Sequence, residues 1–275
     1  MNRRYNLLNG TVRAGRTIQK NQRSPGRFQE GRDMTKIKAI LFDLDGTLLP
    51  VDQEEFTKAY FGLVAAKAAP LGYEPKRLVD AVWAGTIAMV KNDGKESNET
   101  VFWKKFSSIF SEDARKDREV FDDFYRVEFN ELRKICRPDP DAAVALKRIK
   151  ALGFRVALAT NPLFPSVATE NRIRWAGLEP GDFEFYTAYE TIGLSKPNPK
   201  YYLEVANRIG LEPNECAMVG NDAFEDGIAG TVGMRVFLLT DCLINKDNRD
   251  ISAIPHGGFK RMMEWAERLN QPAAE

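Results

Sequence analysis

The sequence predicts an α/β protein, a doubly wound parallel sheet with an inserted helical domain. Three observations predict this class. A segment that begins with alternation at Lys36 becomes a continuous apolar run, a block with helical periodicity follows over residues 53–135, and short apolar runs then alternate with helical patterns over residues 141–239. Strands separated by helices of about 10 to 15 residues form right-handed crossovers, and these produce a parallel sheet. The helical block is therefore an insertion after the first strand.

The first strand is the run that starts at Lys36 and ends before Asp43. It begins with alternation and becomes continuously apolar, which is typical of a strand that enters a buried parallel sheet. The run stops at Asp-Leu-Asp-Gly-Thr, residues 43–47. Two aspartates therefore lie at the carboxyl end of the first predicted strand.

Residues 53–135 carry apolar side chains at the spacing of amphipathic helices. The pattern i, i+4, i+7, i+8 occurs at residues 56–64 and again at residues 102–110, and another helical face covers residues 78–90. We expect three or four helices, joined by polar turns such as residues 91–94. The aromatic residues in these stripes are expected to pack in the helix core.

After residue 137 the pattern alternates between helix and strand, and three of the helical patterns end at a glycine, which favours the position just after a helix. The expected helices cover residues 141–152, 166–176, 199–209 and about 224–231, and the expected strands cover residues 154–159, 183–187, 216–219 and 234–239. The sequence thus divides into a core of residues 34–50 and 137–275 and a cap of residues 51–136.

The composition is that of an ordinary globular protein, with 43% hydrophobic and 29% charged residues. The net charge of +1 excludes a general basic field for nucleic acid, and no apolar run is long enough to predict a membrane span. Three widely spaced cysteines and the single His256 argue against a disulfide framework and a zinc or multi-histidine site. We expect a cytoplasmic protein with no nucleic-acid or membrane partner.

The first 33 residues differ from the rest of the chain. Residues 1–34 contain eight Lys or Arg residues against two acidic ones, which gives a charge of +6, and they show almost no apolar periodicity. We interpret this disordered head as a tag or as a stretch after an upstream start codon. An Arg-rich presequence and a basic nucleic-acid arm are the alternatives.

Polar residues follow each predicted strand. Because ligand crevices in open parallel sheets lie at the carboxyl ends of the strands, these side chains are expected to meet at one rim. They are Asp43, Asp45, Thr160, Asn161, Ser195, Lys196, Asn221, Asp222 and Asp226. Carboxylates gathered in this way require a cation, and an all-oxygen set selects a hard ion such as Mg²⁺. A carboxylate can also attack phosphorus, while a lysine and a hydroxyl group bind phosphoryl oxygens.

These residues form four ordered motifs that resemble those of the haloacid dehalogenase-like (HAD) superfamily. The resemblance covers residues 36–240 and implies a Rossmann-like core with a helical cap of the first class. It implies that Asp43 is the nucleophile and that Asp45 is the general acid, which later activates water and whose carbonyl oxygen binds Mg²⁺. Thr160 and Asn161 would bind the phosphate, and Lys196 would hold the phosphate and the nucleophile.

The fourth motif departs from the family pattern, which often places the metal-binding aspartate directly after the glycine. This chain has Asn221 in that position. Counting from Gly220 selects Asn221, whereas counting back four residues from Asp226 selects Asp222. We favour Asp222 as the metal ligand beside Asp43 and Asp45, with Asp226 in support, because a carboxylate binds Mg²⁺ better than an amide oxygen.

The resemblance implies a Mg²⁺-dependent phosphatase that acts on a small phosphorylated metabolite through an aspartyl-phosphate. A phosphomutase would use the same core and would differ in how the cap excludes water. A dehalogenase would attack carbon without a metal, but the dehalogenases of this superfamily lack an acid at the position of Asp45. A catalytically idle binding protein is the alternative from another class.

Deletion of residues 1–33 should leave both the melting temperature and the phosphatase activity unchanged, because the head has no apolar face and no motif. Thermal unfolding and turnover of an aryl phosphate by the shortened chain measure this. A large loss of either would show that the head packs on the core.

Overall fold

A five-stranded parallel sheet lies at the centre of residues 35–110 and 116–271, the part of the chain that this computed structural model describes. The strand order is β2-β1-β3-β4-β5, and each neighbouring pair is parallel. The strands are β1 (Ala39–Phe42), β2 (Arg155–Leu158), β3 (Cys216–Gly220), β4 (Arg235–Leu239) and β5 (His256–Gly257). The predicted fold class is therefore confirmed, while the head of residues 1–33 lies outside the described residues.

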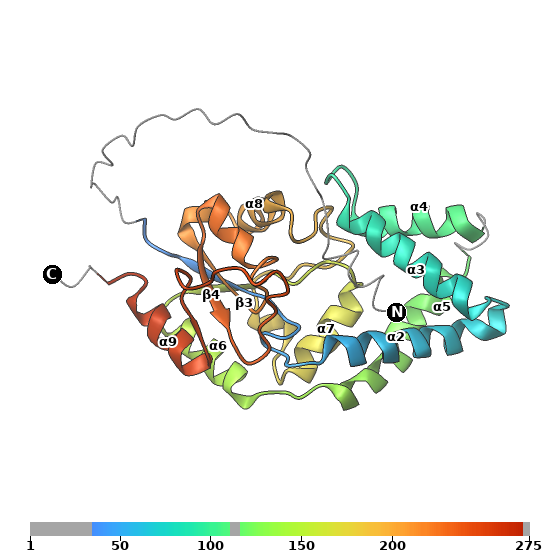
Figure 1. The fold of residues 1–275 in the computed structure, drawn as a ribbon, viewed down its shortest axis with the longest axis horizontal. Helices are drawn as coiled ribbons and strands as arrows, with labels where there is room; N and C mark the ends of the chain where they lie inside the picture. Colours follow the sequence, from blue (N-terminus) through green and yellow to red (C-terminus); the bar gives the residue numbers. More distant parts are fainter. Residues whose placement is uncertain (1–34, 111–115, 272–275) are drawn as a thin grey trace. The chain divides into compact units, whose positions relative to one another are not determined.

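Helices cover both faces of this sheet (Figure 1). Ile40 and Phe42 point to one apolar cluster, which includes residues of α6, α7 and α9, and Ala39 and Leu41 point to a second cluster with α8. All four residues are completely buried, which explains the continuous apolar run of β1. The core helices are α6 (Pro140–Ala151), α7 (Ser166–Trp175), α8 (Pro199–Arg208) and α9 (Phe259–Arg268).

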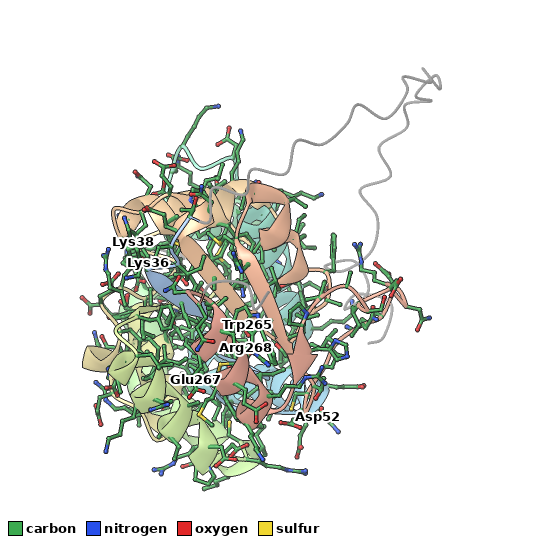
Figure 2. All side chains as sticks on the ribbon, turned by 90° about the vertical axis from the view of Figure 1, so that its left-hand side faces the viewer. Lys36, Lys38, Asp52, Trp265, Glu267 and Arg268 are labelled. Carbon is green, nitrogen blue, oxygen red and sulfur yellow. The ribbon has the colours of Figure 1, made fainter. Side chains whose placement is uncertain are left out.

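The ends of these elements follow local chemistry. Asp139 and Asn198 cap α6 and α8, where each side chain accepts a backbone N–H, and a proline occupies the first turn of both helices. The amide group of Asn270, just after α9, exchanges two hydrogen bonds of 2.8 Å with the backbone of Ile37, just before β1. Figure 2 shows Lys36 and Lys38 on the same face as Trp265, Glu267 and Arg268 of α9.

Two predicted elements differ in the structure. Residues 183–187 do not form a regular strand, but they pair with the outer edge of β2 through three backbone hydrogen bonds and a bridge between Tyr186 and Leu158. The helix predicted at 224–231 is a 3-10 segment, Gly227–Val232, because its glycines disfavour an α-helix. The elements β5 and α9 were not predicted. Three further 3-10 turns are Ala69–Leu71, Pro180–Asp182 and Pro213–Glu215.

The insertion between β1 and β2 is helical, as predicted. Its elements are α2 (Gln53–Ala68), α3 (Pro75–Val90), α4 (Asn98–Phe110), α5 (Arg118–Arg126) and a 3-10 segment (Glu128–Ile135). The two connections to the core pair with each other through a bridge between Val51 and Cys136. Phe56, Phe106 and Phe129 are buried, which confirms that the aromatic stripes form a helix core.

Asn98 also joins the insertion to the core. This completely buried first residue of α4 donates from its side chain to the Pro162 carbonyl oxygen at 3.1 Å and to Ser195 Oγ at 3.0 Å. Its backbone N–H donates to the Ile192 carbonyl oxygen at 3.0 Å. The start of α4 is thus bound to the core segment that directly precedes Lys196.

The structure also tests the simpler expectations from composition. Cys136, Cys216 and Cys242 are free thiols, as the spacing predicted. His256 lies in β5, where its Nδ1 is 2.7 Å from the Ile254 carbonyl oxygen. No helix among the described residues is long and apolar enough to cross a bilayer.

Candidate active site

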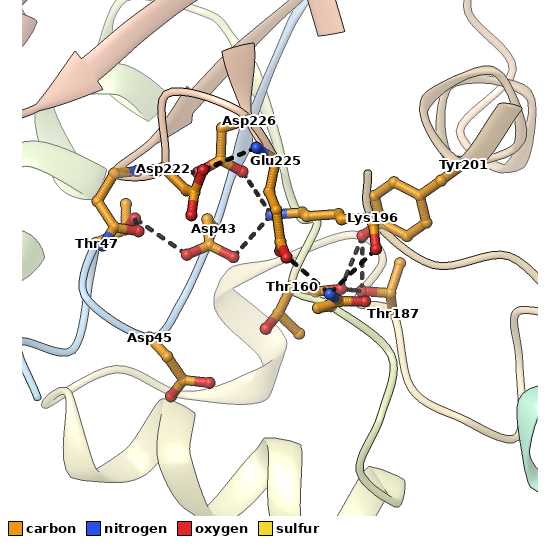
Figure 3. A network of polar contacts seen from close by, with 12 residues as sticks. Asp43, Asp45, Thr47, Thr160, Thr187, Lys196, Tyr201, Asp222, Glu225 and Asp226 are labelled. Carbon is orange, nitrogen blue, oxygen red and sulfur yellow. Dashed lines mark hydrogen bonds and ion pairs between the residues drawn. The ribbon is translucent and has the colours of Figure 1, made fainter. Parts of the chain in front are cut away.

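The predicted site residues lie on loops at the carboxyl edge of the sheet (Figure 3). Asp43 directly follows β1, Thr160 lies two residues after β2, and Asp222 lies two residues after β3. The register pairs Phe42 with both Leu158 and Val219, so that the three loops leave the sheet at nearly the same level.

Lys196 joins the loops after β1 and β3 through a buried ion-pair network. Its Nζ donates to Asp43 Oδ1 at 2.8 Å and to Asp226 Oδ1 at 2.6 Å, and all three side chains are largely buried. Burial alone would lower the pKa of Lys196, but the charges of Asp226 and Asp43 raise it well above its usual range. The ammonium group therefore stays charged and fixes the Asp43 carboxylate.

Asp43 has partners on both carboxylate oxygens. Oδ1 accepts from Lys196, and Oδ2 accepts from Thr47 Oγ1 at 3.1 Å. Burial raises the pKa of Asp43 to about 7, against the opposing effect of Lys196 and with a further raising effect of Asp226. A cation bound beside Asp43 would oppose this rise, because it would stabilise the charged carboxylate.

Asp226 shapes the loop that follows β3. Its Oδ2 accepts the backbone N–H groups of Asn221 at 3.0 Å and Asp222 at 2.9 Å. A Cβ atom at Gly220 would lie 2.1 Å from Asp226 Oδ2, so only glycine lets the backbone approach this carboxylate. Asp226 therefore holds both the loop and Lys196.

The two candidates of the fourth motif have different surroundings. Asn221 is buried, its Nδ2 donates to the Cys242 carbonyl oxygen at 2.8 Å, and its Oδ1 accepts from Thr47 Oγ1 at 3.1 Å. The amide is thus used to brace neighbouring loops. Asp222 is half-buried, and its Oδ1 accepts two backbone N–H groups of its own turn, from Phe224 and Glu225, both at 2.8 Å.

Hydrogen bonds from buried hydroxyl groups hold the backbone of the loop after β2. The Thr160 carbonyl oxygen accepts from Thr187 Oγ1 at 2.6 Å and from the Tyr201 hydroxyl at 2.8 Å. Asn161 Nδ2 donates to Glu225 Oε2 at 3.2 Å, and Asn161 Oδ1 is buried without a partner among the described residues. A buried amide oxygen without a partner is rare in folded proteins.

Glu225 is a site residue that sequence reasoning missed. Burial, together with the charge of Asp222 and against the opposing charge of Lys196, raises its pKa to about 8. Only its position directly before Asp226 could have indicated that it lies in the site. Glu225 brings another acidic side chain to the rim, where it contacts Asn161 of the loop after β2.

The carboxylate of Asp45 does not join the Asp43 cluster. It forms an ion pair with Arg172 of α7, and Figure 3 shows it directed away from Asp43 and Lys196. Arg172 is also a residue that sequence reasoning missed, because it lies within a predicted helix and outside every motif. The expected meeting of all carboxylates at the rim is therefore correct for Asp43, Asp222 and Asp226 but wrong for the side chain of Asp45.

The donors at this rim fit a hard divalent cation. No three His, Cys, Asp or Glu side chains are grouped as a metal cage within residues 35–110 and 116–271. Mg²⁺ commonly uses only one or two carboxylates and fills its other positions with water and phosphate oxygens. The carboxylates of Asp43 and Asp222 supply such oxygen donors at the same edge of the sheet (Figure 3).

Comparison with known proteins identifies relatives of the whole α/β unit. Residues 37–231 match the model of the haloacid dehalogenase-like hydrolase family. A glyceraldehyde 3-phosphate phosphatase of Methanopyrus kandleri is 25% identical over 73% of this chain and 84% of its own length. An (S)-2-haloacid dehalogenase 4A of Burkholderia cepacia is 25% identical over 72% of this chain and 80% of its own length.

A solved structure shows the same fold. The HAD phosphatase from Thermococcus onnurineus superimposes with a TM-score of 0.53 and 20% identity, over 83% of this chain and 97% of that one. At this identity the likeness concerns the fold alone.

Asp226→Ala should lower the free energy of unfolding by about 3 kcal/mol, because Lys196 loses one buried carboxylate and two backbone N–H groups lose their acceptor. Asp222→Ala is the matched control, and its loss should be about 1 kcal/mol, because the removed carboxylate accepts from backbone of its own turn. Urea denaturation in EDTA measures both. Equal losses would contradict the structural role of Asp226.

Proposed function

The chain belongs to the haloacid dehalogenase-like hydrolases, and on this premise we propose that it is a Mg²⁺-dependent phosphatase that hydrolyses a small phosphorylated metabolite through an aspartyl-phosphate on Asp43. The observation that carries the proposal is the environment of Asp43. A buried carboxylate is held at the rim by Lys196 and Thr47, and a second acidic residue, Asp45, follows two residues later in the chain.

Asp45 favours phosphate transfer over dehalogenation. The relatives include both phosphatases and dehalogenases, so their names alone do not decide between the two reactions. A leaving alkoxide must receive a proton, whereas a leaving halide needs none. A carboxyl group at position 45 therefore has a catalytic purpose in a phosphatase and none in a dehalogenase.

The first step transfers the phosphoryl group to Asp43. A carboxylate oxygen of Asp43 attacks phosphorus, the bond from phosphorus to the leaving oxygen breaks, and Asp45 gives that oxygen a proton. Lys196 neutralises charge on the nucleophile and on the phosphoryl oxygens. Thr160 and Asn161, on the loop after β2, would donate hydrogen bonds to the remaining oxygens.

The second step releases phosphate. Asp45, now ionised, takes a proton from a water molecule, and the water oxygen attacks phosphorus as the bond to Asp43 breaks. Lys196 again balances the charge of the departing Asp43 carboxylate. The enzyme returns to its starting state with Asp45 protonated.

Asp43, Asp222 and the main-chain carbonyl of Asp45 would hold the Mg²⁺ ion. When bound, Mg²⁺ neutralises the charge that the phosphate brings to a rim already rich in carboxylates. Asp222 is preferred to Asn221 because the Asn221 amide already braces Cys242 and Thr47. Asp226 supports this arrangement through the backbone rather than as a ligand.

The substrate class is small phosphorylated metabolites. A named relative acts on glyceraldehyde 3-phosphate, and another acts on phosphoglycolate. The helical insertion, which is bound to the core beside Lys196 through Asn98, would close the site above the phosphate and select the organic part. A panel of phosphorylated metabolites identifies the substrate, and transfer of the phosphate to a sugar instead of water would indicate a phosphomutase.

Asp43→Asn should lower turnover of p-nitrophenyl phosphate by at least about 10³-fold, because an amide is a far poorer nucleophile than a carboxylate. The amide keeps the shape of the side chain, so the circular dichroism spectrum should not change. Turnover within about tenfold of the original enzyme, with deamidation excluded by mass spectrometry, would remove Asp43 from this role.

Removal of divalent cations should stop hydrolysis. EDTA should abolish turnover, Mg²⁺ should restore it, and Ca²⁺ should not, because Ca²⁺ takes six to eight ligands at longer distances. Isothermal titration of the metal-free protein with Mg²⁺ gives a second readout, and Asp222→Ala should weaken binding more than Asn221→Ala. Full activity in chelator would favour dehalogenase-type chemistry.

A further inference from the structure

Arg172 is a buried cation that contacts a predicted catalytic residue from outside the four motifs. Its side chain is 1% exposed, and its Nη1 donates to Asp45 Oδ2. The guanidinium is fixed by other contacts: Nε donates to the Ala168 carbonyl oxygen at 3.3 Å, Nη2 donates to Thr169 Oγ1 at 3.3 Å, and the group lies over the ring of Phe164 at 4.6 Å. Arg172 is therefore a rigid anchor for Asp45.

The two carboxylate oxygens of Asp45 have unequal surroundings. Oδ2 is bound to Arg172, whereas Oδ1 is buried and has no hydrogen-bond partner within the described residues. A buried oxygen without a partner is rare in folded proteins, and a catalytic role is one of its explanations, beside strain and a bound water or ion. The Asp45 side chain is 26% exposed and the Arg172 side chain is 1% exposed. Asp45 is therefore the partner of the ion pair that a substrate can reach, and Arg172 is buried in the core.

On the basis of the proposed phosphatase activity, we propose that Arg172 is the positioning residue of the general acid Asp45. Arg172 binds one oxygen, so the proton to be transferred resides on the other. As the bond from Asp43 to phosphorus forms and the bond to the leaving oxygen breaks, the proton on Asp45 Oδ1 moves to the leaving oxygen. In the second step Oδ1 takes a proton from the attacking water.

The direction of Asp45 agrees with this role. In phosphoryl transfer the attacking and leaving oxygens lie roughly in line, on opposite sides of phosphorus. An acid that serves the leaving oxygen must then lie apart from the nucleophile, and Figure 3 shows the Asp45 carboxylate directed away from Asp43. Without Arg172 the carboxylate would adopt several rotamers, and a displaced catalytic group can lose about 10²-fold in rate.

Two substrates of nearly equal size separate positioning of the acid from general damage. p-Nitrophenyl phosphate has a leaving group that departs without a proton, whereas phenyl phosphate depends more on an acid. Arg172→Met should slow phospho-enzyme formation from phenyl phosphate by at least about tenfold, and from p-nitrophenyl phosphate by about threefold or less. Arg174→Met, on the same helix but 46% exposed, is the matched control and should change neither rate.

The double variant tests whether Arg172 acts through Asp45. In the Asp45→Asn background, Arg172→Met should leave the ratio of the two rates unchanged. Two results would overturn the positioning role. One is that Arg172→Met slows the reactions of both substrates equally. The other is that Arg172→Met changes the ratio of the two rates by the same factor in the Asp45→Asn background as in the unmodified enzyme. If Arg172→Met does not fold, Arg172→Lys carries the same comparisons, with a smaller loss, because lysine keeps the charge and one donor to Oδ2.

The failure of the proposed function would look different. If the unmodified enzyme forms no phospho-enzyme from either substrate, the phosphatase mechanism is wrong and the role of Arg172 falls with it. Suppose instead that the unmodified enzyme forms the phospho-enzyme and that Asp45→Asn slows the reaction with phenyl phosphate more than the reaction with p-nitrophenyl phosphate. The phosphatase mechanism then stands, and the Arg172 variants test the positioning role alone.

Discussion

The buried ammonium of Lys196, held between the carboxylates of Asp43 and Asp226, is the interaction on which the candidate site depends. It connects the end of β1, the segment before α8 and the loop after β3, which are far apart in the sequence. Asp226 extends the connection by accepting two backbone N–H groups of its own loop, and Gly220 leaves the space for this contact. A buried charge needs such partners, because an unpaired one strongly destabilises the fold.

The helical insertion is joined to the core at the places where the catalytic loops lie. Asn98 binds the segments that precede Lys196 and follow Asn161. Phe164, also on the loop after β2, packs against Tyr60 of α2 with ring centroids 5.5 Å apart and supports the guanidinium of Arg172. The position of the insertion and the positions of the phosphate-binding loops and of Asp45 are therefore coupled through direct contacts.

The sequence was sufficient to predict the features that are determined within a single segment, such as a buried strand and the polar residues at its end. The apolar run before Asp43 predicted a buried strand, and the rule that strand ends share one edge brought Asp43, Thr160 and Asp222 together. The contacts of Arg172 and Glu225 could not be predicted, because each arises from packing between distant segments and a helix pattern treats both as ordinary charged residues. Residues 183–187 lie along the outer edge of β2, as the strand pattern suggests, but the pairing is limited to three backbone hydrogen bonds and one bridge, so no regular strand forms.

The most direct test of the account is to locate the covalent intermediate. The enzyme is mixed with Mg²⁺ and p-nitrophenyl phosphate, quenched in acid, and reduced with borohydride, which converts an aspartyl-phosphate to homoserine. Peptide mass spectrometry should then find homoserine at position 43 and unmodified aspartate at positions 45, 222 and 226. Homoserine at another of these positions, or unmodified Asp43 in an enzyme that turns over in the same sample, would contradict the account.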